Sequence, residues 1–418
     1  MKKQLLIASA LMSAHLAQAA EFEVSGYVGF EWREHFEEGQ FNNASNEQAD
    51  RQLGFTAEPE MVWSLAEGEH TIVFKPYARI DSADDERSHG DIRELSWMTY
   101  GDDWEVTAGI SKVYWGVTES QHLVDIVNQT DFVEAPDGED KLGQPMVKLS
   151  LIRDWGTVTG FVLPGFRERT FPGEEGRFRT ALPISSGDAE YQAGEEDAHV
   201  DYAVRWNHTI EDYDLGLSWF NGTSRDPLFV PTGFESPAPG ITVPTKLSPF
   251  YVQINQVGLD LQATLDSWLW KFEAIYRSYD DSAKHSFADF GVEDYTAATG
   301  GFEYTFYGPF ETVWDWGVLA EYQYDSREDA ALAIGQNDAF LGSRIAFNDT
   351  ASSQMLAGIS QDLDSASTQS FVMEFSTRIN EGMTLNVDAF LLMSDDDENV
   401  SYQFKRDDYV QLSLNYYY

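Results

Sequence analysis

The sequence predicts an all-β protein, a transmembrane antiparallel up-and-down β-barrel of about 18 strands, with 16 as the alternative count. Three observations support this prediction. Apolar and polar residues alternate with period two from end to end. Long and short connections alternate in phase, and tryptophans gather beside the short ones. A soluble β-sandwich, the competing class, has no reason to keep its connections in that phase.

The N-terminal stretch "MKKQLLIASALMSAHLAQAA" has two lysines, an apolar core and a small-residue end. This pattern predicts a secretory signal peptide over residues 1–20, which leaves residues 21–418 as one barrel domain. No run of 18 apolar residues follows, which argues against a spanning helix. The chain has no cysteine, so disulfides play no part in the fold.

The predicted strands share one apolar face and one polar face. In the first of them, Phe22, Val24 and Val28 oppose Glu23 and Ser25. The expected segments are 21–33, 51–64, 70–81, 92–100, 103–112, 145–153, 156–165, 198–208, 213–222, 250–265, 267–279, 294–307, 311–324, 339–348, 353–362, 370–379, 383–393 and 407–418.

Two prolines fall inside adjacent predicted strands. Pro59 and Pro76 each lack the N–H group that a ladder needs, so we expect a local bulge there.

Short connections such as "AEGE", "GDD" and "DWG" alternate with long ones such as "EHFEEGQFNNASNEQAD". This asymmetry is typical of outer-membrane barrels, with tight periplasmic turns and longer outer loops. The tryptophans beside the short turns predict an interfacial girdle: Trp63, Trp104, Trp155, Trp206, Trp268 and Trp314. Both termini then lie on the periplasmic side.

The chain ends "YVQLSLNYYY", an alternating strand that closes on an aromatic residue. It resembles the C-terminal recognition signal of bacterial outer-membrane proteins, with Tyr416 and Tyr418 as the aromatic positions. The resemblance implies an integral protein of a Gram-negative outer membrane. Its expected partners are the barrel-assembly machinery, membrane lipid and lipopolysaccharide.

A second resemblance lies in "RELSWMTYGDDWEVTAGISKVYWGVTESQHLVDIVNQTDF", about 40 residues. This segment is similar to alginate-export-like and related porin-like families, many of them of unknown function. The resemblance implies a channel-forming barrel and leaves the solute open.

A barrel of 16 to 18 strands encloses water, so the polar strand faces predict the pore lining. The residues that we expect to line the pore are Lys75, Arg79, Lys148, Arg205, Lys271, Arg277, Arg344, Glu303, Asp315, Glu321, Glu374 and Asp388. The predicted lumen is mixed in charge and tends to be acidic, and it would set ion preference through the field of these groups.

The segment from Val113 to Gln144 is long for a connection and is the candidate for a loop that folds into the pore. Its constriction residues are predicted to be Trp115, Gly116, Asp125 and Asn128. The apolar spacing of Leu123, Val124, Ile126 and Val127 indicates a short helix. Packing over the outer rim is the equal alternative, and the segment 166–197 raises the same question.

The formal net charge of -44 excludes a nucleic-acid binder, which needs a basic surface. Acidic loops such as "DSADDERSHGD" and "SDDDEN" offer oxygen ligands to Ca²⁺ or Mg²⁺. None has the spacing of an EF-hand, so solvation is the preferred interpretation and no metal site is predicted.

Enzyme motifs of the G-x-S-x-G or H-E-x-x-H type do not occur. His199 beside Asp201 is the single pair that suggests an acid–base site at the rim. Because no catalytic motif occurs and this pair stands alone, we expect no enzyme and no cofactor.

The sequence predicts a channel for diffusion or partner-coupled passage of ions or small polar solutes. The alternative is a barrel plugged by its own loops with a structural or surface-binding role.

Overall fold

The computed structural model describes residues 21–42, 47–287, 290–328, 331 and 335–418. The predicted signal peptide over residues 1–20 lies outside these. The described chain forms one 18-stranded antiparallel sheet that closes on itself, because the first strand pairs with both the second and the last. The predicted fold class is confirmed.

Every predicted segment overlaps a strand of this barrel. Its first nine strands are β1 Glu21–His35, β2 Arg51–Leu65, β3 His70–Asp81, β4 Gly90–Tyr100, β5 Trp104–Ser111, β6 Gln144–Arg153, β7 Gly156–Pro164, β9 Val200–Ile210 and β10 Tyr213–Thr223. The other nine are β15 Gln253–Leu265, β16 Trp268–Tyr279, β17 Tyr295–Tyr307, β18 Asp315–Asp325, β19 Asn337–Ala346, β20 Gln354–Asp362, β21 Gln369–Asn380, β22 Met383–Met393 and β23 Tyr409–Tyr417.

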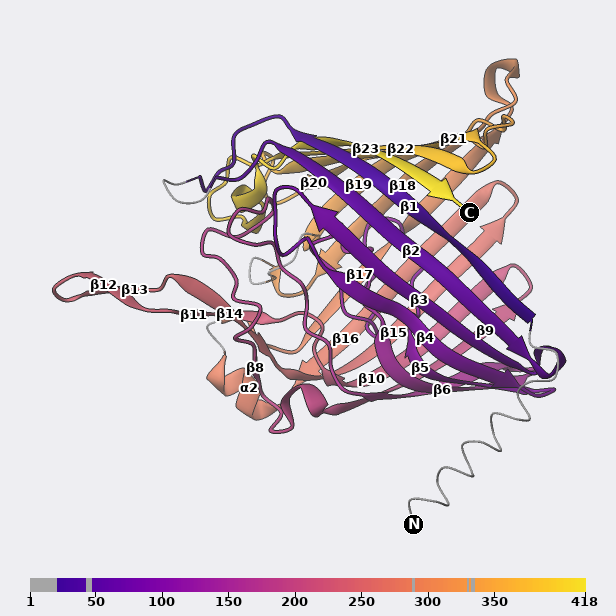
Figure 1. Ribbon diagram of the computed structural model, residues 1–418, viewed down its shortest axis with the longest axis horizontal. Helices are drawn as coiled ribbons and strands as arrows, with labels where there is room; N and C mark the ends of the chain where they lie inside the picture. Colours follow the sequence, from indigo (N-terminus) through magenta and orange to yellow (C-terminus); the bar gives the residue numbers. More distant parts are fainter. Residues whose placement is uncertain (1–20, 43–46, 288–289, 329–330, 332–334) are drawn as a thin grey trace, which may run out of the picture.

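The long connections contain small elements that the sequence did not indicate. Five short strands form separate sheets: β8 Glu190–Tyr191, β11 Leu228–Thr232, β12 Glu235–Ala238, β13 Ile241–Val243 and β14 Lys246–Tyr251. One helical turn, α2 Asp281–Ser286, and the 3-10 turns η2 Glu196–Ala198 and η6 Val400–Phe404 also lie in long connections, whereas the 3-10 turns η1 Ala66–Gly68 and η4 Pro309–Glu311 lie in short ones. The β12–β13 hairpin projects away from the barrel (Figure 1).

The two faces of the wall differ in what they expose. Trp219 is 40% exposed, whereas its neighbour Phe220 is 1% exposed. Phe272 is likewise 39% exposed beside a fully buried Glu273. Because successive side chains of a strand point to opposite faces, the exposed apolar residues form an outer belt and the buried groups face the interior.

The two ends of the barrel also differ. The long connections gather at one end, and β1 begins and β23 ends at the other (Figure 1). Within the described ranges, no helix is long and apolar enough to cross a lipid bilayer.

The bulge expected at the prolines is present. Pairing of β2 with β3 stops between Ala57↔Ala78 and Met61↔Phe74. Pairing of β3 with β4 changes register between Lys75 and Pro76. The missing N–H groups explain both interruptions.

Candidate functional site

The connection 112–143 lies inside the barrel. Its side chains Trp115, Val124 and Val127 belong to one hydrophobic cluster with Phe161 of β7 and Ile275 of β16. Both of these wall residues are on the inner face, since their strand neighbours Val162 and Tyr276 are exposed in the outer belt. We call residues 112–143 the inner loop.

The predicted helix over residues 123–127 is wrong. Residues 121–130 form turns and bends, although Val124, Ile126 and Val127 are buried as expected. Within this segment the N–H of Val124 bonds to the wall carboxylate of Glu273 instead of to a helix carbonyl, and the preceding N–H groups of Val117 and Thr118 bond to the same carboxylate.

Two buried wall carboxylates hold the inner loop. Oε1 of Glu273 accepts from the backbone N–H of Val117 at 2.7 Å and of Thr118 at 3.1 Å, and Oε2 accepts from that of Val124 at 3.2 Å. On β18, Glu321 accepts from the backbone N–H and the hydroxyl of Ser120 at 2.8 and 2.6 Å. Hydrogen bonds to charged acceptors are among the stronger ones in proteins.

The predicted constriction residues organise the inner loop. Asn128 is 1% exposed, and its amide group donates to the carbonyls of Ser111 and Leu142, which joins the two ends of the loop. Asp125 accepts from the N–H of Trp115 at 3.2 Å. Gly116 has φ +144°, and a Cβ there would lie 3.1 Å from Oε1 of Glu273, so only glycine fits.

The twelve predicted pore-lining residues all lie on the inner face. The seven basic ones each have a carboxylate within 4.0 Å: Lys75 has Glu58 and Glu60, Arg79 has Glu31 and Glu134, Lys148 has Glu105, Arg205 has Asp260, Lys271 has Glu119, Arg277 has Asp226, and Arg344 has Glu119 and Glu303. The side chains of Arg79 and Arg277 are 7% and 6% exposed, whereas that of Arg344 is 40% exposed.

Two of the acidic positions have a different environment. Glu374 and Asp388 are direct cross-strand partners in β21 and β22. Neither has a basic side chain within 4.0 Å among the described residues; Asp388 accepts a hydrogen bond from Gln411 Nε2 at 3.3 Å. Asp315 accepts from Asn348 Nδ2 at 2.9 Å, and Glu303 pairs with Arg344. Uncompensated negative charge therefore collects on the β21–β22 wall.

The inner loop adds acidic groups to the interior. Asp137, Glu139 and Asp140 are exposed. The protein around the loop desolvates Asp140, and together with the nearby charges of Glu134 and Asp137 this raises the pKa of Asp140 to about 6. A carboxylate surrounded by others is harder to ionise.

A second connection, between β7 and β9, reaches the opposite wall. Its Arg177 donates to Asp407 and Asp50, and its Phe178 packs edge-on against Phe390 of β22 and Tyr409 of β23. The segment 166–197 therefore spans the mouth of the barrel.

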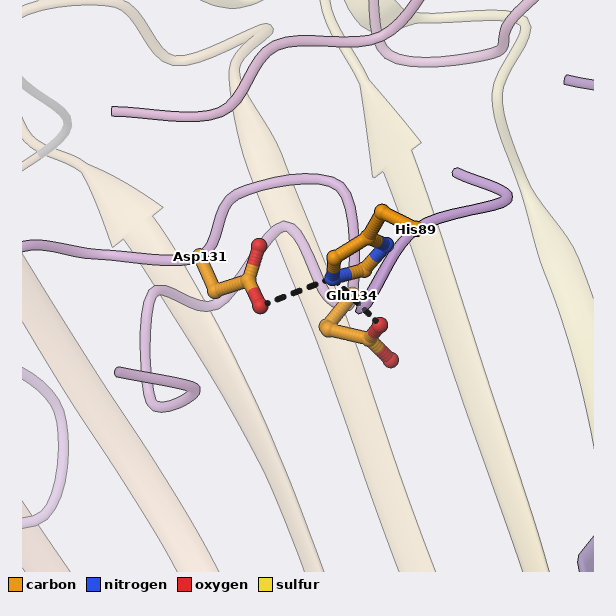
Figure 2. A group of neighbouring side chains, drawn as sticks. All are labelled: His89, Asp131 and Glu134. Carbon is orange, nitrogen blue, oxygen red and sulfur yellow. Dashed lines mark hydrogen bonds and ion pairs between the residues drawn. The ribbon is translucent and has the colours of Figure 1, made fainter. Parts of the chain in front are cut away.

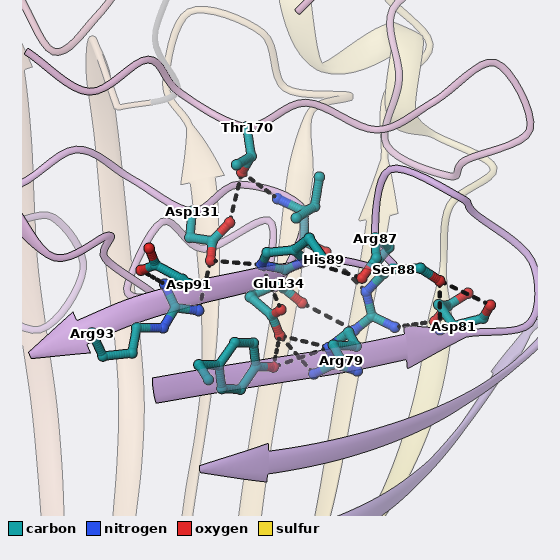
Figure 3. A network of polar contacts seen from close by, with 12 residues as sticks. Arg79, Asp81, Arg87, Ser88, His89, Asp91, Arg93, Asp131, Glu134 and Thr170 are labelled. Carbon is teal, nitrogen blue, oxygen red and sulfur yellow. Dashed lines mark hydrogen bonds and ion pairs between the residues drawn. The ribbon is translucent and has the colours of Figure 1, made fainter. Parts of the chain in front are cut away.

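A polar network joins the inner loop to the start of β4 (Figure 3). Five carboxylates and four guanidinium groups are linked through it: Glu31, Asp81, Asp91, Asp131 and Glu134 with Arg79, Arg87, Arg93 and Arg167. His89 lies between Asp131 and Glu134. Apart from Arg79, the sequence interpretation did not single out these residues, because no short motif connects them.

The pair His199 and Asp201 is formed, with Nδ1 and Oδ1 2.9 Å apart. The other oxygen of Asp201 accepts from Arg225 at 2.6 Å, and Oδ1 also accepts from the backbone N–H of Thr223. The carboxylate is fully engaged in holding the loop after β10.

The C-terminal strand closes the barrel against β1, with Tyr417 opposite Tyr27. The N–H of Tyr418 donates to the carbonyl of Gly26 at 3.1 Å. Tyr416 and Tyr418 are about half exposed, 51% and 50%, on the outer face.

No protein-family model matches the sequence, and no curated protein is similar to it. The likeness to alginate-export-like proteins therefore stays an interpretation of about 40 residues.

Solved structures do resemble the barrel. OpdO of Pseudomonas aeruginosa matches with a TM-score of 0.53 at 9% identity, over 97% of this chain and 98% of that chain. A BenF-like porin from Pseudomonas fluorescens Pf-5 matches with 0.53 at 8% identity, over 96% and 99%. OccK8 (OprE) of Pseudomonas aeruginosa matches with 0.51 at 12% identity, over 95% and 98%. The chain has the fold of a Gram-negative outer-membrane porin barrel.

Proposed function

We propose that the protein is a porin-like channel of a Gram-negative outer membrane that passes ions and small polar solutes and prefers cations. This proposal rests on one observation: on the inner face, basic side chains are neutralised by ion pairs more completely than carboxylates are. All seven basic positions have carboxylate partners, whereas Glu374 and Asp388 have no basic partner in the part of the chain that the structure describes. Unpaired carboxylates facing water attract cations and repel anions.

The inner loop sets the size of the passage in this proposal. It is fixed to one side of the lumen by Glu273 and Glu321 and carries Asp137 and Asp140 toward the water. A solute would pass between these loop carboxylates and the β21–β22 wall. No reaction and no cofactor are needed for such passage.

The test is the reversal potential of the purified, refolded protein in a planar bilayer under a salt gradient. We expect discrete steps with cation preference. In the double variant Glu374→Gln, Asp388→Asn, the cation-to-anion permeability ratio falls by about threefold, since two field-setting charges are gone. Glu398→Gln, in an outer loop, is the control. An unchanged ratio in the double variant would refute the cation mechanism.

Silence at all voltages from folded protein would favour the plugged, surface-binding barrel over the channel. In that case the inner loop and the segment 166–197 together close the lumen.

The assembly proposal rests on Tyr416 and Tyr418. We infer that the aromatic end is read by the barrel-assembly machinery, and that lipid and lipopolysaccharide surround the outer belt. Tyr418→Ala is expected to lower the amount of folded protein in the outer membrane without changing its conductance once refolded. Normal membrane levels of this variant would show that Tyr418 is not part of the signal.

A further inference from the structure

Three acceptor atoms converge at the junction of the inner loop and the wall. They are Nε2 of His89, Oδ2 of Asp131 and Oε1 of Glu134, and all lie within 4.8 Å of one another. Figure 2 shows the imidazole pointing between the two carboxylates. His89 precedes β4, and the two acidic residues belong to the inner loop.

The hydrogen bond of Nδ1 fixes the tautomer of a neutral His89. Nδ1 lies 3.1 Å from the carbonyl oxygen of Arg87, and a carbonyl can only accept, so Nδ1 carries the proton. In the neutral ring Nε2 then offers a lone pair toward Asp131 and Glu134. Metal-binding histidines commonly donate their other ring N–H to a backbone carbonyl in this way.

In each of the two carboxylates, one oxygen accepts hydrogen bonds from neighbouring side chains, and the other oxygen points toward Nε2 of His89. Glu134 is 6% exposed; its Oε2 accepts from Tyr77 and Arg79, whereas its Oε1 has no hydrogen-bond donor among the described residues. Asp131 is fully buried; its Oδ1 accepts from the Thr170 hydroxyl at 2.7 Å, and its Oδ2 lies 2.6 Å from Arg93. An unpaired buried carboxylate oxygen is costly and calls for a cation.

The distances between the three atoms also suit the ligands of one metal ion, although His89 and Asp131 lie within hydrogen-bond distance of each other. Nε2 of His89 lies 3.2 Å from Oδ2 of Asp131 and 3.4 Å from Oε1 of Glu134. Charge-assisted N–H···O bonds are about 2.7–2.9 Å long. Ligands about 2.0–2.1 Å from a tetrahedral zinc ion are roughly 3.4 Å apart.

The linked network holds five carboxylates and four guanidinium groups, so one further positive charge balances it. A bound cation beside a neutral His89 would supply that charge, as would a proton on His89.

We propose that His89, Asp131 and Glu134 bind one divalent transition-metal ion, best zinc, which cross-links the inner loop to the start of β4. One nitrogen and two oxygen ligands suit zinc, and Arg93 shares the Asp131 oxygen with the ion. The site does not depend on whether the barrel conducts.

The experiment uses the folded full chain in detergent, stripped with a chelator and then titrated with Zn²⁺. We expect one zinc per chain after desalting, and the visible absorption of a tetrahedral ion when Co²⁺ replaces it. His89→Ala should abolish stoichiometric binding, and Glu134→Gln should weaken it by more than about tenfold. His285→Ala, an exposed histidine in α2, is the matched control and should bind as the wild type does.

Circular dichroism establishes that each variant is folded. X-ray absorption of the wild-type zinc complex gives the ligand set without any substitution, and one imidazole with carboxylate oxygens is expected. The proposal is overturned if the folded wild type retains no zinc, or if His89→Ala retains as much as the wild type. Either result would assign the converging acceptors to a proton shared by His89 and the carboxylates.

Discussion

The inner faces of two parts of the wall contrast, although their outer faces are alike. From β6 to β17 the inner face carries buried apolar residues such as Phe161, Phe220 and Ile275, on which the inner loop packs. On β21 and β22 it carries Glu374 and Asp388, for which the described ranges contain no basic partner. The period-two pattern of the outer belt therefore defines a barrel. The composition of the inner face then distinguishes the wall from β6 to β17, which is covered by the inner loop, from the β21–β22 wall, which faces water.

The largest effect is expected at Glu273, the buried carboxylate of β16 that binds backbone N–H groups of the inner loop. Glu273→Ala leaves the N–H groups of Val117, Thr118 and Val124 without their acceptor, at about 1–3 kcal/mol each if they stay buried. The inner loop should leave the wall, which makes it sensitive to trypsin at Lys141 and raises the conductance. Glu105→Ala, an inner-face glutamate that pairs with Lys148, is the control. A trypsin-resistant loop in Glu273→Ala would mean that apolar packing alone fixes it.

A smaller loss follows from removing packing alone. Val127→Ala creates a cavity in the cluster between loop and wall and should cost about 2 kcal/mol of unfolding free energy. Val162→Ala removes the same atoms from the outer belt of β7, where the side chain is 42% exposed. Denaturant unfolding should show a larger loss of unfolding free energy for Val127→Ala than for Val162→Ala. Equal losses would contradict the assignment of Val127 to a packed interface.

A pH effect tests the loop's own ion pair. Burial would lower the pKa of His122, but hydrogen bonds and charges of Glu139 and Glu273 outweigh it and raise the pKa to about 10. Because the folded pKa exceeds the unfolded value of about 6.5, the imidazolium stabilises the loop fully below that pH. This contribution decreases as pH rises toward 10. Trypsin sensitivity should increase between pH 7 and 10 in the wild type and change less in His122→Gln. The same pH dependence in both proteins would exclude His122 as its source.

The smallest effect is expected for the ion selectivity after removal of the positive charge of Arg344, which faces the lumen. Arg344 pairs with Glu119 and Glu303, and its side chain is 40% exposed. Arg344→Gln frees Glu303, whereas Glu119 keeps Lys271. The reversal potential should shift slightly toward cations, opposite in sign to the shift of the Glu374→Gln, Asp388→Asn variant. A shift toward anions would show that the β21–β22 carboxylates do not govern selectivity.

The strands and their facing were predictable because each strand pairs with a neighbour in the chain. Alternation over ten residues identifies the outer face of β16, for example, where Trp270 and Phe272 are exposed and Lys271 and Glu273 are not. The interrupted pairing near Pro59 and Pro76 was likewise predictable, because proline itself lacks the N–H group that a sheet ladder needs.

The inner loop was predictable as a candidate but not as a structure. Its apolar residues are buried as their spacing indicated, yet the expected helix is absent. The spacing cannot report that carboxylates elsewhere in the chain will accept the loop's backbone N–H groups.

The amino-acid sequence by itself determined the barrel, its strands and the sides on which apolar and charged residues lie, because these depend on local alternation and on pairing between successive strands. Only the tertiary structure decided which charges are neutralised and where the loops go. Thr118 meets Glu273 across 155 positions and Arg33 meets Gln411 across 378. Contacts of that range exist only once the barrel has closed, so no local pattern encodes the unpaired carboxylates of β21–β22 or the meeting of His89 with Asp131 and Glu134.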